Sequence, residues 1–127
     1  MVSQRLKLIR KFFGEGKELI DKDPVQSSEK LYKAVEESVK TLAYLYDLKD
    51  VLEKVDKHGR WTVAFLESVV KKLRDRVEGL REAWDVANYL HVWGFHEGKL
   101  DKESIEMRIP SIEKLLRSLE EIVEAAK

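Results

Sequence analysis

The sequence predicts an all-α protein, an up-and-down bundle of four to five helices that forms a single domain over residues 1–127. Three observations support this fold class. Apolar residues recur with the 3.6-residue period of an α-helix along nearly the whole chain. No segment alternates apolar and polar residues as a strand does, and no Asn-Gly or Asp-Gly hairpin turn occurs. The connections between helical segments are short, which favours antiparallel neighbours.

The first helix is expected from about Ser3 to Asp21, because one face of this segment is apolar at helical spacing. Gly14 and Gly16 lie inside it, where each glycine costs about 1 kcal/mol relative to alanine. The two glycines therefore predict either a close contact with another helix or a break in this one. The apolar face carries Leu6, Ile9, Phe13 and Ile20.

The second helix is expected to begin after Asp23, since aspartate is a favourable N-cap and Pro24 suits the first helical position. It should end at residue 46 or 47. Glu36 and Lys40 are four residues apart on the face expected to meet water, which is a favourable pairing in a helix. The apolar stripe consists of Leu31, Val35, Val39, Leu42 and Tyr46.

Residues 47–60 are polar and include His58-Gly59, a plausible turn, although their few apolar residues are also compatible with a short helix. A third helix is expected to begin at Trp61 or Thr62. Its last turn is rich in cations, which suit the negative end of the helix dipole. The residues expected to face inward are Phe65, Val69 and Leu73.

The fourth helix is expected from about Val77 to Trp93, with Gly94 as its end. The fifth should begin near residue 101 or 104 and run to about residue 125. Pro110 lies within it and must kink or restart it, because proline lacks an amide donor and clashes with the preceding turn.

The composition excludes several classes of protein. Lys and Arg total 24, and so do Asp and Glu, so there is no chain-wide basic field of the kind that drives nucleic-acid binding. The absence of cysteine excludes disulfides, thiolate catalysis and Cys-ligated zinc. A charged N-terminal segment does not resemble a secretory signal, and no apolar run approaches the length of a membrane span. A cytoplasmic location is therefore expected, and the abundance of Lys and Glu resembles a thermophile composition.

The segment from Trp84 to Glu97 carries the strongest chemical signal, because rings and imidazoles are concentrated there. His91 is expected on a largely buried stripe. An imidazole there either forms a hydrogen bond with a carbonyl or carboxylate in the core or lies at the centre of a functional site. Asp85 and Asn88 precede it along roughly one side of the helix. A carboxylate and an amide beside an imidazole could tune it as a general acid or base.

No metal site and no cofactor are expected. His91, His96 and Glu97 are possible ligands, but the two histidines are five residues apart rather than the four of a helical zinc pair. Neither His-Glu-x-x-His nor Glu-x-x-His occurs, so a metalloprotease and a di-iron bundle are both unsupported. His96 and Glu97, which follow Gly94, remain candidate binding residues.

A local cluster of cations near the end of the third expected helix is the best candidate for binding a phosphate backbone, with nearby rings available for stacking on bases. Arg81 follows it closely. Asp75 and Glu78 dilute the cluster, and the alternative interpretation is a solvated helix end. Its members are Lys71, Lys72, Arg74 and Arg76.

The rings around the fourth helix are more numerous than one small bundle is expected to bury. Tyr89 and Trp93 are four residues apart, on a face different from that of Trp84 and His91. Because aromatic side chains are enriched in interface cores, this helix is expected to pack against a second copy of the chain. The interface residues expected are Trp84, Tyr89, Trp93 and Phe95.

Two segments resemble the archaeal PaREP family, which belongs to the HEPN superfamily (higher eukaryotes and prokaryotes nucleotide-binding). One is residues 26–40 of the second expected helix. The other is the pattern Trp84-x-x-Ala87-x-x-Leu90-His91-x-x-x-Phe95-x-Glu97. The similarity spans about residues 5–125.

The resemblance implies a HEPN-like bundle of four to five helices that dimerises. It also implies relatives that are metal-independent ribonucleases of the toxin or defence type, often paired with small nucleotidyltransferases. Their catalytic signature is an Arg followed by His after four to six residues. At the corresponding places before His91 this chain has Trp84, Asp85 and Val86, and Arg81 is ten residues away. Only His91 carries over.

The absent arginine favours a non-enzymatic role for a HEPN-like homodimer: a binding or assembly module for RNA, a nucleotide or a partner protein. The alternative is a metal-independent ribonuclease that uses His91, helped by Asp85, Asn88 or Arg81. A third hypothesis is an antitoxin-like structural subunit paired with a nucleotidyltransferase.

Overall fold

The computed structural model describes residues 2–127, and these residues form α-helices and one π-helical segment with no strand. The prediction of an all-α fold is confirmed. The expected number of four to five helices is too low, because residues 47–60 contain a helix and the fifth expected helix is two helices. None of the helices in residues 2–127 is both long and apolar enough to cross a membrane. The elements are α1 (Val2–Leu19), α2 (Pro24–Leu45), α3 (Lys49–His58), α4 (Val63–Leu73), α5 (Leu80–Tyr89), η1 (Leu90–His96), α6 (Lys102–Glu106) and α7 (Ile109–Ala125).

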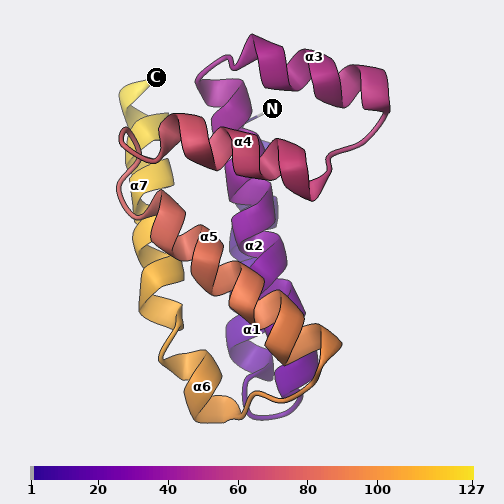
Figure 1. Ribbon diagram of the computed structural model, residues 1–127. Helices are drawn as coiled ribbons and strands as arrows, with labels where there is room; N and C mark the ends of the chain where they lie inside the picture. Colours follow the sequence, from indigo (N-terminus) through magenta and orange to yellow (C-terminus); the bar gives the residue numbers. More distant parts are fainter. Residues whose placement is uncertain (1) are drawn as a thin grey trace.

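Helix α2 forms the centre of the bundle. Figure 1 shows α1 running antiparallel beside α2, and α5 and α7 lying along the same bundle. Helices α3 and α4 run across one end of it, whereas α6 lies at the opposite end (Figure 1). The apolar stripe expected on α2 is completely buried from Leu31 to Leu42 by these neighbours. Burial of that stripe on several sides holds the bundle together.

The helix starts follow the expected capping chemistry. The Asp23 carboxylate accepts a hydrogen bond from the Gln26 amide at 3.1 Å, and Pro24 occupies the first turn of α2. Asp101 caps α6 in the same way, at 2.8 Å from the Ser104 amide. The proline within the fifth expected helix lies at the start of α7, so it restarts the helix rather than kinking it.

The two glycines of α1 have different roles. A β-carbon on Gly16 would lie 2.7 Å from the Leu31 Cγ atom, so a side chain there would collide with α2. The Ser27 hydroxyl also donates to the Gly16 carbonyl at 2.6 Å. Gly14 has nothing within 4 Å of the same position. The expected close helix contact is therefore confirmed at Gly16, and α1 continues unbroken through both glycines.

The expected pairing of Glu36 with Lys40 is wrong. Lys40 donates instead to Glu37 at 2.9 Å, and Glu36 is half-buried rather than solvent-facing. The reason is that Glu36 follows the buried Val35 at the edge of the apolar stripe, where its side chain is partly covered.

Candidate functional site

The fourth expected helix does not end at Gly94. Helix α5 continues into η1 (Leu90–His96), a π-helical segment in which hydrogen bonds reach five residues back instead of four. The last of them joins the Glu97 amide to the Val92 carbonyl at 2.9 Å. Gly94 is buried against α2, where an added β-carbon would lie 2.5 Å from the Ser28 Cβ atom. Because of the wider turn, residues five apart in η1 lie on one face.

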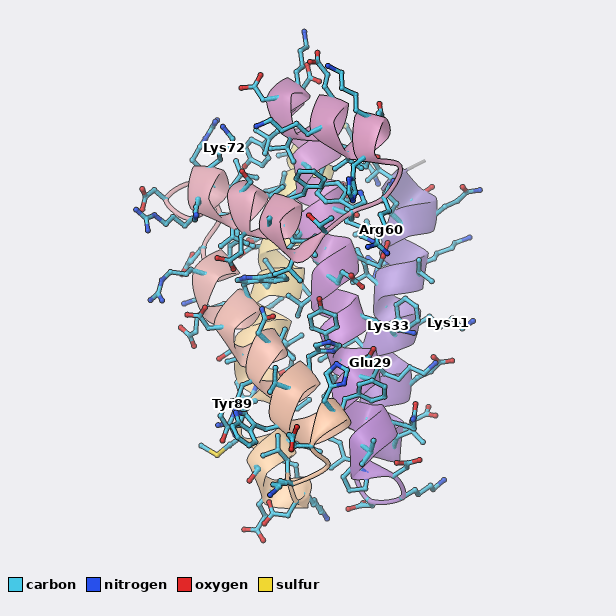
Figure 2. The ribbon with its side chains drawn as sticks, turned by 45° about the vertical axis from the view of Figure 1, so that its right-hand side comes forward. Lys11, Glu29, Lys33, Arg60, Lys72 and Tyr89 are labelled. Atoms are coloured by element: carbon cyan, nitrogen blue, oxygen red, sulfur yellow. The ribbon has the colours of Figure 1, made fainter. Side chains whose placement is uncertain are left out.

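His91 lies in this segment and faces α2. Its Nδ1 atom is 2.8 Å from the Glu29 Oε1 atom, and Figure 2 shows Glu29 where α2 faces η1. Its ring stacks on Tyr32, with centroids 4.2 Å apart. Its Nε2 atom is 3.1 Å from the Nε2 atom of His96. Since the carboxylate accepts hydrogen bonds, the proton of a neutral His91 ring sits on Nδ1, and the Nε2 lone pair is directed at His96.

Two further side chains of α2 surround this imidazole. Tyr32 is 6% exposed. Burial, with the nearby charges of Glu36 and Glu29, raises the pKa of Tyr32 from 10.0 to about 12, so the phenol stays neutral. Burial also raises the pKa of Glu36, against the opposing effect of Lys40. The α2 side of the site therefore carries two carboxyl groups, that of Glu29, which contacts His91, and that of Glu36.

The residues expected to help His91 lie elsewhere. Asp85 forms an exposed ion pair with Arg81 at 2.9 Å. The Asn88 amide donates to the Trp84 carbonyl at 2.8 Å. Six residues of α-helix correspond to about 600° of rotation, so Asp85 and His91 cannot share a face. Glu29, on another helix, occupies the place that Asp85 was expected to take.

The residues of the predicted basic cluster do not form one patch, because they lie in different places around α4. Lys71 and Arg74 line a groove of about 180 Å³ between α4 and α5. Lys72, labelled in Figure 2, lines a separate hollow, and the Arg76 guanidinium lies 4.9 Å above the Tyr46 ring. We call the first hollow the basic groove; it is lined by Glu67, Val70, Lys71, Arg74, Arg81, Trp84 and Asp85.

Trp84 and Phe95 are not part of the exposed face on which interface residues were expected. Trp84 is 2% exposed, its indole N–H donates to the Glu67 carboxylate, and its ring lies 6.3 Å from that of Tyr32. Phe95 is half-buried, 5.9 Å from the His91 ring. Both rings belong to the packing around the His91 site and leave little surface for a second copy.

Tyr89 and Trp93 do remain on the surface. Tyr89, Val92 and Trp93 are 40%, 42% and 45% exposed, and we call these three residues the aromatic surface. The Arg108 guanidinium lies 3.9 Å over the Tyr89 ring, which is labelled in Figure 2. His96 and Glu97 are also exposed, and His96 is the one that joins the His91 site.

Sequence reasoning missed the α2 side of this site. Glu29, Tyr32 and Glu36 recur at positions i, i+3 and i+7, so they lie along one edge of a helix whose neighbouring stripe is apolar. Three ionisable side chains at that edge were the available signal. Their partner could not be identified, because the helix opposite them is far away in the sequence.

The comparisons with known proteins agree with this architecture. A sequence model of the archaeal PaREP1/PaREP8 family matches residues 4–116. The chain resembles the crystal structure of a Sulfolobus solfataricus protein at 32% identity, with a TM-score of 0.84 over 92% of this chain and 97% of that one. It also resembles the solution structure of the same structural-genomics target, at 32% identity, a TM-score of 0.79 and 91% of each chain. No curated protein matches.

The family match covers most of the chain, and both structural matches share about a third of its residues. The half-buried histidine, the helices that hold it and the buried glycine opposite Ser28 all lie within the matched region. The chain belongs to the archaeal PaREP1/PaREP8 family.

Proposed function

We propose that this protein is a HEPN-like homodimer in the archaeal cytoplasm that pairs through the aromatic surface and serves as a binding module. The exposure of Tyr89, Val92 and Trp93 along one helical face carries the proposal. Contiguous exposed apolar side chains mark interaction surfaces, and rings are enriched in the cores of interfaces. A two-fold contact uses the same patch on both chains, so one such face suffices for a dimer.

The ligand we propose is RNA or a nucleotide held in the basic groove. Lys71, Arg74 and Arg81 bring three cations to this groove and would contact phosphate oxygens. Glu67 and Asp85 share the groove, and the chain carries no net charge, so long-range attraction of nucleic acid is weak. We therefore expect contact with a few phosphates rather than with a long backbone.

Light scattering after gel filtration tests the dimer. The wild-type chain should elute with twice the mass of one chain, and Trp93→Glu should elute as a folded monomer, because a charge cannot be buried unpaired in the contact. Val63→Glu is the matched control, since Val63 is 61% exposed on α4, away from the aromatic surface. A wild-type monomer at high concentration would overturn the proposal.

Fluorescence anisotropy with a labelled single-stranded RNA tests the ligand. Replacing Lys71 and Arg74 by Glu should weaken binding about tenfold or more and reduce the salt dependence by about one phosphate contact per residue. The control replaces Lys54 and Lys57, which are exposed on α3, by Glu. Equal affinity in the two double variants would contradict an RNA site in the groove. Co-purification of a nucleotidyltransferase without RNA binding would favour the antitoxin-like role instead.

A ribonuclease is the second candidate, favoured by the chain of contacts from Glu29 through His91 to His96. In such a reaction, one imidazole would take the proton of a ribose 2′-hydroxyl as its oxygen attacks phosphorus. The other would protonate the departing 5′-oxygen, and the product would be a cyclic phosphate. RNA cleavage should then persist in EDTA, disappear in His91→Ala and His96→Ala, and survive in His58→Ala. Equal cleavage by all four proteins would indicate a contaminant.

A further inference from the structure

The Nε2 atoms of His91 and His96 lie as close together as two ligands of one metal ion. Their separation is 3.1 Å. A Zn–N bond is about 2.0–2.1 Å, so two imidazole nitrogens at a tetrahedral angle are about 3.3–3.4 Å apart. A shift of a few tenths of an ångström would therefore place both nitrogens at bonding distance from one ion. His96 is exposed, so its ring has the freedom to make that adjustment.

The π-helical turn creates this pair. In an α-helix two side chains five residues apart point about 140° away from each other, which is why spacing alone argued against a shared ligand. In η1 the Glu97 amide bonds to Val92, five residues back, and the same period places His96 over His91. The reason for expecting no metal at these two residues is thereby removed.

Glu29 and Tyr32 prepare His91 for a metal. A ligating histidine characteristically donates its other ring N–H to a carboxylate, which fixes the tautomer and makes the ligating nitrogen more basic. The Glu29 contact at Nδ1, at 2.8 Å, is that arrangement, and it leaves Nε2 as the donor. The Tyr32 ring, stacked with an interplanar angle of 27°, holds the imidazole plane. The Glu29 and Glu36 carboxylates lower the electrostatic cost of a nearby cation.

We propose that His91 and His96 bind one first-row transition-metal ion through their Nε2 atoms, with Glu29 orienting His91. Residues 2–127 bring no group of three or more His, Cys, Asp or Glu together around one point. The protein therefore supplies two ligands, and the other coordination positions are open to water or a small ligand. Imidazole nitrogens suit Zn²⁺, Ni²⁺ and Cu²⁺, with Ni²⁺ bound more tightly than Co²⁺.

Calorimetric titration of the full chain, without a histidine tag, tests the proposal with Zn²⁺ and with Ni²⁺ alone. Wild type should bind one ion per chain, and His96→Gln should lose at least tenfold in affinity, since one ligand is removed. His58→Gln is the matched control, because His58 is an exposed histidine on a distant helix. Circular dichroism should give equal helicity for all three proteins, so that an effect on folding is excluded.

A second measurement separates metal binding from a hydrogen bond between the two rings. Paramagnetic Ni²⁺ should broaden the ring resonances of His91 and His96 and leave those of His58 sharp. Glu29→Gln should keep the one-to-one stoichiometry with an affinity about 10–100-fold lower, as expected when the partner of a ligating histidine is weakened. The proposal fails if wild type shows no saturable binding, or if His96→Gln binds as tightly as wild type.

Discussion

Gly94 and Ser28 approach so closely that the π-helical segment and helix α2 leave no room for a side chain between them. A β-carbon at Gly94 would lie 2.5 Å from the Ser28 Cβ atom and closer still to its hydroxyl. The hydroxyl is held by a hydrogen bond to the Pro24 carbonyl at 2.9 Å, so it cannot turn aside without losing that bond. The contact places η1 against the part of α2 that carries Glu29 and Tyr32.

Gly94→Ala should therefore destabilise the protein by about 1–3 kcal/mol, the usual range for overpacking a dense contact. Urea unfolding measures the change. Gly14→Ala is the matched control, because nothing lies within 4 Å of that position and α1 is helical there, so this variant should gain about 0.5–1 kcal/mol. Equal stability of Gly94→Ala and wild type would contradict the prediction, since it would mean that α2 moves to make room for the added methyl group. Partial recovery in a double variant with Ser28→Gly would identify Ser28 as the obstacle.

Ser27→Ala should cost about 1–3 kcal/mol, because it removes the hydroxyl that donates to the buried Gly16 carbonyl at 2.6 Å and leaves that carbonyl unsatisfied. Ser118→Ala is the comparison. Its hydroxyl also donates to a carbonyl, that of Glu78 at 2.9 Å, but in an exposed position where water replaces it. Thermal unfolding of the two variants should separate them by several degrees. If both lose the same amount, burial is not the cause.

The stability of the protein should fall at alkaline pH because of Tyr32. Its pKa is about 12 in the folded chain, against 10.0 for an unperturbed tyrosine. The folded state therefore keeps the proton more tightly: the stabilisation is complete below pH 10 and is lost as the pH rises through 12. A shift of two pKa units corresponds to about 2–3 kcal/mol. Unfolding of wild type and Tyr32→Phe from pH 8 to 11 should show about half of this loss, since pH 11 lies midway between the two pKa values. Parallel curves would contradict the prediction.

Glu36→Gln should stabilise the protein at neutral pH. Burial raises the pKa of Glu36, so its ionised form is unfavourable in the folded state. This cost is present when the pH lies above the folded pKa, and it disappears as the pH falls below the unfolded value, so the gain from Gln should vanish in acid. Glu37→Gln is the control, since it removes the ion pair with Lys40 at 2.9 Å and should bring no gain. A Glu36→Gln variant less stable than wild type at pH 7 would refute this account.

Most of the fold was predictable because its signals are local. The Asp23 cap, the proline restart of α7 and the buried stripe of α2 follow from a few neighbouring residues each. The continuation past Gly94 was not predictable, because it depends on the contact with Ser28 on another helix. His91 and His96 could be singled out, whereas the contacts of His91 with Glu29 and with His96 could not be predicted. Glu29 is remote in sequence, and His96 lies at a spacing from His91 that does not bring two side chains together in an α-helix.

The aromatic residues show the same division. Periodicity correctly separated the face of Tyr89 and Trp93, which is exposed, from that of Trp84, which is not. Periodicity could not indicate that the indole N–H of Trp84 finds its hydrogen-bond acceptor within the same chain, because that acceptor, the Glu67 carboxylate, belongs to α4. The face on which a residue lies follows from the sequence of one helix, whereas the residue that it contacts on another helix depends on how the helices are arranged.

Because Leu90–His96 is wound as a π-helix, the number of residues between the two histidines decides whether their rings face each other. Inserting a single residue between the two histidines would place them six apart, which in an α-helix turns them about 120° away from each other, whereas deleting one residue would leave them four apart on one α-helical face. Changes in length, which are usually tolerated at surfaces, would here divide relatives into those whose two imidazoles face each other and those whose imidazoles point apart. Aligning family members by the number of residues between these histidines, rather than by their identity, would therefore sort them by chemistry.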